Sequence, residues 1–359
     1  MIADQAYRDG MRFFDLGNLA AATAGFELAL RLDAAHIEAR YELGNVLQQQ
    51  QSWAIAAQHY QKVLLRDPAH ARAHNNLGAS LQMLGREADA ASCYMQAITL
   101  APRLAQPYIN LGRLHQQAGR PADAATCYRQ ALEHCAERDT FSHLLAAIEG
   151  GAGAAVAAPA AYVRETFDGF APGFDDRLIG QLDYRVPAAV AAALDEVRVF
   201  APGSADVLDL GCGTGLAGAP LRARARHLTG VDLAPKMLAA ARARGCYDVL
   251  AEADILAWMD AADSAAFDLV VAADVFIYLG DLADIFTEVA RLLRPGGLFA
   301  FSVELSSREK WLLQPSGRYA QSHAYIASLA AASGLSVALR RQQPIRKPLV
   351  GALYILSRP

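Results

Sequence analysis

One stretch of the chain combines a buried strand with glycines at alternate positions. Residues 207–210 are apolar apart from Asp209, which predicts a buried parallel strand. Gly211, Gly213 and Gly215 follow directly. Because glycine has no side chain, it lets the backbone turn sharply and approach a ligand closely. The spacing is typical of a loop that binds a nucleotide.

Acidic residues around this loop bear on which nucleotide it binds. Gly213, Gly215 and Gly218 also fit the G-x-G-x-x-G spacing of a dinucleotide-binding loop. Asp209 favours another ligand, because its carboxylate would repel a pyrophosphate and attract an ammonium group. Asp232 ends the next predicted strand, where it could accept hydrogen bonds from ribose hydroxyls or cap the following helix. Asp232 is therefore compatible with either nucleotide.

Residues 207–218, 228–233, 248–255, 267–278 and 294–303, in this order, resemble the motifs of class I S-adenosylmethionine-dependent methyltransferases. The resemblance implies S-adenosylmethionine as the cofactor and methyl transfer from its sulfonium as the reaction. It also implies that Asp254 accepts a hydrogen bond from the adenine amino group and that Ile255 packs on the ring. The cofactor-binding residues expected on this basis are Asp209, Gly211, Gly213, Gly215, Asp232, Leu233, Met237, Asp254, Ile255 and Asp274.

The second half of the chain alternates predicted strands and helices, which indicates an α/β domain with a parallel sheet. Five strands are expected near residues 207, 228, 247, 268 and 297, and residues 334–339 and 350–356 supply two more. The resemblance implies a Rossmann-like domain over 161–359 with a seven-stranded mixed sheet in the order 3-2-1-4-5-7-6.

The first 138 residues repeat with a period of 34. A small residue recurs at positions 8 and 20 of each block and an aromatic residue at position 24, without gaps; the blocks are 3–36, 37–70, 71–104 and 105–138. Such helix pairs bury a core only by stacking on their neighbours, and residues 139–148 are expected to cap the stack. The array over 1–150 resembles tetratricopeptide repeats, which implies an α-solenoid whose concave face binds a protein or peptide partner.

Two further features concern the surface of the array and its end. Asn76 and Asn110 share one block position, where they could form a ladder to a peptide backbone or simply be solvent-exposed polar residues. Residues 151–160 are small and uncharged and predict a flexible linker between the two domains.

Several residues are candidates for acceptor chemistry. The aromatic pattern at 167–175 resembles the lid of small-molecule and some protein methyltransferases, although core packing would explain Phe167 and Phe170 nearly as well. A base is expected among Asp274, Tyr278 and His323, with Glu304 also considered. Asp274 could equally cap a turn, Tyr278 could be a wall, and Glu304 could pair with a surface arginine. Arg318 and Arg346 could hold a carboxylate or phosphate. The expected substrate-binding residues are Phe167, Phe170, Tyr278, Arg318, Tyr319 and Arg346.

Composition narrows the class of protein. A formal net charge of −4 argues against a nucleic-acid partner. No apolar run of about 18 residues predicts a membrane span. Five cysteines without a C-x-x-C pair indicate reduced thiols and no metal framework. No signal peptide is visible, so a cytoplasmic location is expected. The excess of alanine, and of arginine over lysine, suggests a bacterial source.

We therefore expect a methyltransferase that acts on a small-molecule or protein-borne acceptor, with the repeats recruiting a partner or substrate protein. Two alternatives remain open. A non-catalytic donor-binding scaffold would keep every motif. An NAD(P)-dependent Rossmann oxidoreductase would have no use for Asp209 or Asp254.

Overall fold

The computed structural model describes residues 2–151, 155–171, 173–347 and 349–359, apart from the side chains of Phe170 and Gln181. Its chain forms two compact units, Met1–Leu145 and Ala146–Pro359.

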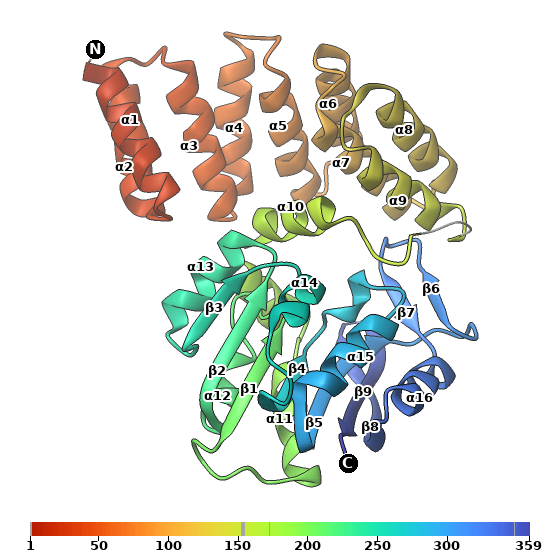
Figure 1. Ribbon diagram of the computed structural model, residues 1–359. Helices are drawn as coiled ribbons and strands as arrows, with labels where there is room; N and C mark the ends of the chain where they lie inside the picture. The colour runs from red at the N-terminus through yellow and green to blue at the C-terminus, as the bar shows by residue number, and fades with distance from the viewer. Residues whose placement is uncertain (1, 152–154, 172, 348) are drawn as a thin grey trace. The chain divides into compact units, whose positions relative to one another are not determined.

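The N-terminal unit is a series of helices with two helices to each 34-residue block (Figure 1). The helices are α1 (Ile2–Asp15), α2 (Leu19–Leu32), α3 (Ile37–Gln49), α4 (Trp53–Leu64), α5 (Ala71–Met83), α6 (Glu87–Leu100), α7 (Ala105–Gln117), α8 (Pro121–His134) and α9 (Arg138–Ile148). The glycine at position 8 of each block makes room for the aromatic ring at position 24 of the same block. A Cβ at Gly44 would lie 2.7 Å from the Tyr60 ring, and one at Gly112 would lie 2.2 Å from the Tyr128 ring. The predicted helical repeat region is confirmed.

Amide side chains link neighbouring repeats. The Asn76 amide donates to the Tyr41 hydroxyl at 3.0 Å and to Asn45 Oδ1 at 2.8 Å. One repeat later, the Asn110 amide donates to Asn75 Oδ1 at 3.0 Å. Asn76 and Asn110 therefore connect successive repeats to one another. The sequence led us to expect either a ladder to a bound peptide or simple exposure to solvent. The bonds to side chains of the preceding repeat are a third role, which links one repeat to the next.

The C-terminal unit is built on one seven-stranded sheet in the order β3-β2-β1-β4-β5-β9-β8. The strands are β1 (Ala205–Leu210), β2 (Ala225–Asp232), β3 (Val249–Glu252), β4 (Phe267–Ala272), β5 (Leu293–Glu304), β8 (Ser336–Arg346) and β9 (Leu349–Ser357). The first five are parallel, and β9 runs antiparallel to both β5 and β8. This confirms the predicted order, since β8 and β9 are the sixth and seventh strands of the sheet. The insertion after β5 adds a separate hairpin of β6 (Trp311–Leu313) and β7 (Tyr319–Gln321).

Helices cover both faces of this sheet (Figure 1). Successive residues of β1 point to opposite faces: Leu208 packs in one core with Phe286 of α15, and Val207 packs in the other with Val190 of α11. The helices and short helical turns are α10 (Ala160–Phe170), η1 (Asp176–Gln181), α11 (Val186–Val197), α12 (Gly218–Arg222), α13 (Pro235–Arg244), α14 (Ile255–Ala261), η2 (Phe276–Tyr278), α15 (Ala283–Leu292) and α16 (His323–Ala332). None of the described helices is both long and apolar enough to span a membrane.

The segment that precedes α10 is bonded to the sheet unit. The Ala158 N–H donates to the Tyr278 carbonyl at 2.9 Å, and the Gly280 N–H donates to the Val156 carbonyl at 2.7 Å. The Tyr319 hydroxyl donates to the Ala155 carbonyl at 2.6 Å. Residues 155–158 therefore do not form the free tether that their composition suggested. Composition could not reveal these bonds, because residues 155–158 take part in them only through backbone groups, which every residue carries.

Candidate active site

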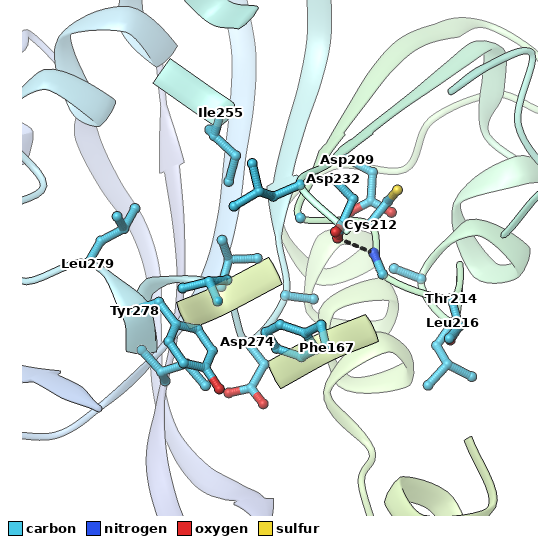
Figure 2. Close-up of a pocket in the computed structure, with 18 of the residues that line it drawn as sticks. Phe167, Asp209, Cys212, Thr214, Leu216, Asp232, Ile255, Asp274, Tyr278 and Leu279 are labelled. Atoms are coloured by element: carbon cyan, nitrogen blue, oxygen red, sulfur yellow. Dashed lines mark hydrogen bonds between the residues drawn. The ribbon is translucent and has the colours of Figure 1, made fainter. Parts of the chain in front are cut away.

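A cavity of about 360 Å³ opens at the carboxyl ends of β1, β2 and β4 (Figure 2). Ligands of open α/β sheets bind at this edge. Twelve of the residues singled out by the sequence line it: Phe167, Asp209, Gly211, Gly213, Asp232, Leu233, Asp254, Ile255, Asp274, Tyr278, Arg318 and Arg346.

Most of the remaining predicted site residues lie away from the cavity. Gly215 packs against the Tyr247 ring, and Met237 is fully buried in α13. Tyr319 is buried and uses its hydroxyl to hold the backbone of residue 155. The Phe170 side chain lies outside the part of the structure that is described.

His323 is also absent from the described wall of the cavity, which corrects the expectation that it is a candidate base there. It is the first residue of α16, and its Nδ1 lies within hydrogen-bonding distance of the Tyr354 hydroxyl on β9. Burial and Arg340 both lower the pKa of His323. His323 follows the insertion after β5, and spacing in the sequence does not reveal where such an insertion leads the chain.

The glycine loop leaves room for a ligand at one particular residue. Gly211 and Gly213 have φ values of +62° and +54°, a left-handed conformation that favours glycine. A Cβ at Gly211 would lie 2.6 Å from Val275, whereas a Cβ at Gly213 would meet no protein atom within 4 Å. Gly213 therefore presents bare backbone to the cavity.

Asp232 is fixed opposite this glycine by backbone donors. Its Oδ2 accepts from the Gly213 N–H and its Oδ1 from the Ala234 N–H, each at 2.8 Å (Figure 2). Burial raises the pKa of this carboxyl, and the backbone hydrogen bonds partly offset that effect. Asp254, at the other end of this wall, caps α14 by accepting from Leu256 and Ala257 through Oδ1.

Asp209 is the most buried acid of the cavity, with 1% of its surface exposed. Burial raises its pKa to about 7, and the nearby Asp232 carboxylate adds to this effect. The Tyr247 hydroxyl donates to Asp209 Oδ2 at 2.7 Å and lowers the pKa in part. Asp209 therefore changes charge close to neutral pH when no ligand is bound.

A buried ion-pair network forms another wall. Arg346 donates from Nη1 to Asp274 Oδ2 at 2.5 Å and from Nη2 to Glu304 Oε1 at 2.6 Å. Arg346 is 6% exposed and Glu304 is 3% exposed. This pairing corrects the expectation that Arg346 offers its guanidinium to an acidic acceptor, and it places Glu304 in the interior and not at the surface.

Asp274 has an unusual backbone conformation and an unused acceptor atom. Its φ is +62°, a strained value for a residue with a side chain. Its backbone N–H donates to the Ser302 hydroxyl at 2.8 Å. Oδ1 is buried and has no hydrogen-bond partner among the described residues. Burial raises the pKa of this carboxyl, and Arg346 and Arg318 oppose the rise.

Aromatic residues complete this end of the cavity. The Phe167 and Tyr278 rings meet edge to face, with centroids 5.4 Å apart. Arg318 also lines the cavity, and its Nη1 lies 3.9 Å from Glu304 Oε1. Figure 2 shows Tyr278, Asp274 and Phe167 turned toward one another.

Several residues that line the cavity are not predicted from the sequence. Tyr184 lines the cavity, as do Ala157 and Ala158 from the segment expected to be a linker. Tyr247 holds Asp209 from 38 residues away. No local pattern marks them, because each reaches the site through tertiary packing. The described residues contain no cluster of His, Cys, Asp or Glu that could hold a metal ion.

The sheet order and the position of the cavity are those of a methyltransferase domain. Residues 208–301 match the family model of the methyltransferase domain, and residues 71–137 match that of the tetratricopeptide repeat. The chain thus carries a class I S-adenosylmethionine-dependent methyltransferase domain preceded by tetratricopeptide repeats, as the resemblance of its motifs implied. S-adenosylmethionine is the cofactor of this class of domain.

Curated relatives share about 100 residues with this chain. A ubiquinone biosynthesis O-methyltransferase of Xylella fastidiosa (strain 9a5c) is 36% identical over 100 residues, which cover 26% of this chain and 39% of that protein. A malonyl-[acyl-carrier protein] O-methyltransferase of Enterobacter lignolyticus is 41% identical over 98 residues, covering 27% and 38%. A trans-aconitate 2-methyltransferase of Escherichia coli O1:K1 / APEC is 35% identical over 108 residues, covering 30% and 40%. The chain spans about two fifths of the length of these relatives.

Two solved structures are similar to parts of this chain. An S-adenosylmethionine-dependent methyltransferase from Mesorhizobium loti is 22% identical with a TM-score of 0.39 and covers 48% of this chain and 100% of its own. MamA is 22% identical with a TM-score of 0.36 and covers 37% of this chain and 77% of its own.

Proposed function

We propose that the protein transfers a methyl group from S-adenosylmethionine to an oxygen atom of a small-molecule or protein-borne acceptor. The observation that carries the proposal is the open space at Gly213, where an added Cβ would meet no described atom within 4 Å. The Gly213 N–H also bonds to the Asp232 carboxylate, which is thereby held beside this space. The three named relatives are methyltransferases, two of them O-methyltransferases.

The donor would lie between the glycine loop and the carboxylates of β1 and β2. Asp209 would accept from the ammonium of the methionine moiety, and Asp232 from the ribose hydroxyls. Asp254 retains Oδ2 for the adenine amino group while Oδ1 caps α14. Leu233 and Ile255 line the same wall and would pack on the adenine ring.

The acceptor would lie against Asp274 and Tyr278. S-adenosylmethionine would supply an electrophilic methyl group, whose bond to sulfur breaks as the acceptor oxygen attacks. Asp274 Oδ1 is buried, has no hydrogen-bond partner within the described ranges of the chain, and can take the proton of an acceptor hydroxyl, while Arg346 fixes Oδ2. Phe167 and Tyr278 supply the apolar wall that keeps water from the reacting atoms. Arg318 is the remaining candidate contact for an acidic group of the acceptor.

We further propose that the repeat array recruits a partner or substrate protein, as repeats of this class do. The support is the repeat match alone. Asn76 and Asn110 bond to neighbouring repeats, so we do not assign them to partner binding. Deletion of residues 1–145 is expected to raise the KM for a protein-borne acceptor and to leave a free small acceptor nearly unaffected.

The donor half of the proposal is tested by calorimetry with S-adenosylhomocysteine. Wild-type protein should bind it and should not bind NAD. The acceptor half is tested by mass spectrometry of metabolites and proteins from cells with and without the gene, searching for a missing methyl group. With the acceptor identified, Asp274→Asn and Arg318→Ala should lower turnover with little effect on S-adenosylhomocysteine affinity. Donor binding without any methylated product would favour a non-catalytic scaffold instead.

A further inference from the structure

Tyr247 occupies a slot that three glycines keep open. A Cβ at Gly215, Gly218 or Gly230 would lie 3.0, 2.7 or 2.9 Å from the Tyr247 ring. These glycines come from the loop after β1, from α12 and from β2, so the slot is formed by several elements. At the end of the slot, the Tyr247 hydroxyl donates to Asp209 Oδ2 at 2.7 Å. The ring therefore passes between backbone segments and delivers one hydrogen-bond donor to one buried carboxylate.

Asp209 has few other groups to balance its charge. Titratable groups that interact with it are the hydroxyls of Tyr247 and Tyr184, the Cys212 thiol and the Asp232 carboxyl. Within the part of the chain that the structure describes, no lysine or arginine forms an ion pair with Asp209. The Tyr247 hydroxyl is thus the side-chain donor that favours the ionised carboxylate, because a hydrogen bond to the charged form stabilises that form.

We propose that Tyr247 is a positioning residue for the methyl donor. Its hydroxyl orients Asp209 and favours the ionised carboxylate, which then accepts the ammonium group of the methionine moiety. The inference rests on the proposed function, since it takes S-adenosylmethionine as the ligand. The inference also gives a reason for two glycines of the loop. Gly215 and Gly218 fit a dinucleotide-binding spacing in the sequence, but in the structure they make room for the Tyr247 ring, whose hydroxyl holds Asp209.

Two substitutions separate positioning from simple filling of the slot. Tyr247→Phe keeps the ring in the slot and removes only the hydroxyl. Tyr325→Phe is the matched control, because it removes a buried tyrosine hydroxyl that also donates to a carboxylate, Asp281 Oδ1 at 2.7 Å, away from the residues that line the cavity. Two ligands distinguish an effect on the ammonium contact from a general effect on the cavity. S-adenosylhomocysteine carries the ammonium group, and 5′-methylthioadenosine keeps adenine and ribose but has no amino-acid moiety.

The test is calorimetric titration of the full chain with both ligands between pH 6 and pH 8. In wild type, the affinity for S-adenosylhomocysteine should fall as the pH drops through about 7, where Asp209 takes up a proton. Tyr247→Phe should weaken S-adenosylhomocysteine roughly tenfold or more at neutral pH, as expected for the loss of a hydrogen bond to a charged group. It should also move the fall in affinity to higher pH, because the ionised carboxylate is less favoured. Binding of 5′-methylthioadenosine should change by less than about twofold, and Tyr325→Phe should behave as wild type with both ligands.

A second measurement uses wild type alone and does not depend on the folding of a variant. Titration in buffers of different ionisation enthalpy counts the protons released on binding. S-adenosylhomocysteine should release part of a proton below pH 7, and 5′-methylthioadenosine should release none.

Unchanged affinity in Tyr247→Phe, an equal loss for both ligands, or the absence of proton release would overturn the positioning role and leave the proposed function standing. A wild-type protein that binds neither ligand would overturn the proposed function itself, and this inference with it.

Discussion

Replacing Arg346 by alanine should destabilise the C-terminal unit strongly. The guanidinium bonds to two carboxylates, Asp274 and Glu304, in a region where it is 6% exposed and Glu304 is 3% exposed. Removing one member of a buried pair costs about 3–5 kcal/mol, because the partner charge stays buried without compensation. Glu304 keeps a hydrogen bond from Gln314 at 2.6 Å, so it is only partly orphaned. We therefore expect a loss of about 3 kcal/mol in the free energy of unfolding.

Arg341 on the same strand is the matched control. It pairs with Glu196 at 2.5 Å, but the two side chains are 42% and 50% exposed, so solvent screens the pair and its loss should change the free energy of unfolding little. Urea unfolding of the full chain can be followed by the fluorescence of Trp258 and Trp311 in a Trp53→Phe background, because Trp53 is the tryptophan of the array. Equal losses for Arg346→Ala and Arg341→Ala would refute the argument from burial.

An added Asp274→Asn substitution gives a further check on the same reasoning. It removes the charge that Arg346→Ala leaves without a partner. The double variant should therefore be more stable than Arg346→Ala alone. If it is less stable by the full cost of a second independent substitution, the uncompensated charge is not the cause of the loss.

Three other predictions follow from the structure. Gly213→Val should abolish binding of S-adenosylhomocysteine by filling the open space at that residue, and Asp232→Ala should weaken it by roughly 1–3 kcal/mol; wild-type affinity in both variants, measured by calorimetry, would contradict the donor site. A fragment 146–359 should fold and bind S-adenosylhomocysteine, whereas 160–359 should bind it less well, because it lacks the bonded segment and two wall residues; equal affinity would show that the segment is dispensable. Burial, together with two nearby cations, lowers the pKa of His59 to about 4. The unfolded chain therefore binds this proton first as the pH falls below about 6.5. A shift of this size corresponds to about 3 kcal/mol between pH 6.5 and pH 4, and because His59 is only half-buried and partly screened by solvent, we expect the array to lose about 2 kcal/mol. His59→Gln should reduce this loss in melts followed by circular dichroism.

Features that depend on local spacing can be predicted from the amino-acid sequence. The 34-residue period predicts the helical array, because small and aromatic residues recur at fixed positions within each repeat. The glycines after β1 and the acids that end β1 and β2 predict the donor edge, since parallel strands bring their carboxyl ends to one edge of a sheet. Asp209, Gly213 and Asp232 accordingly lie around one cavity.

Which side chains pair with one another depends on tertiary packing. The pairing of Arg346 with Asp274 and Glu304 joins residues 72 and 42 positions apart, and it turns a proposed substrate anchor into a support for a candidate base. The hydroxyl of Tyr247 reaches Asp209 across 38 residues. Such contacts depend on which strands are neighbours and on the register between them, and side-chain type and local spacing carry no information about either.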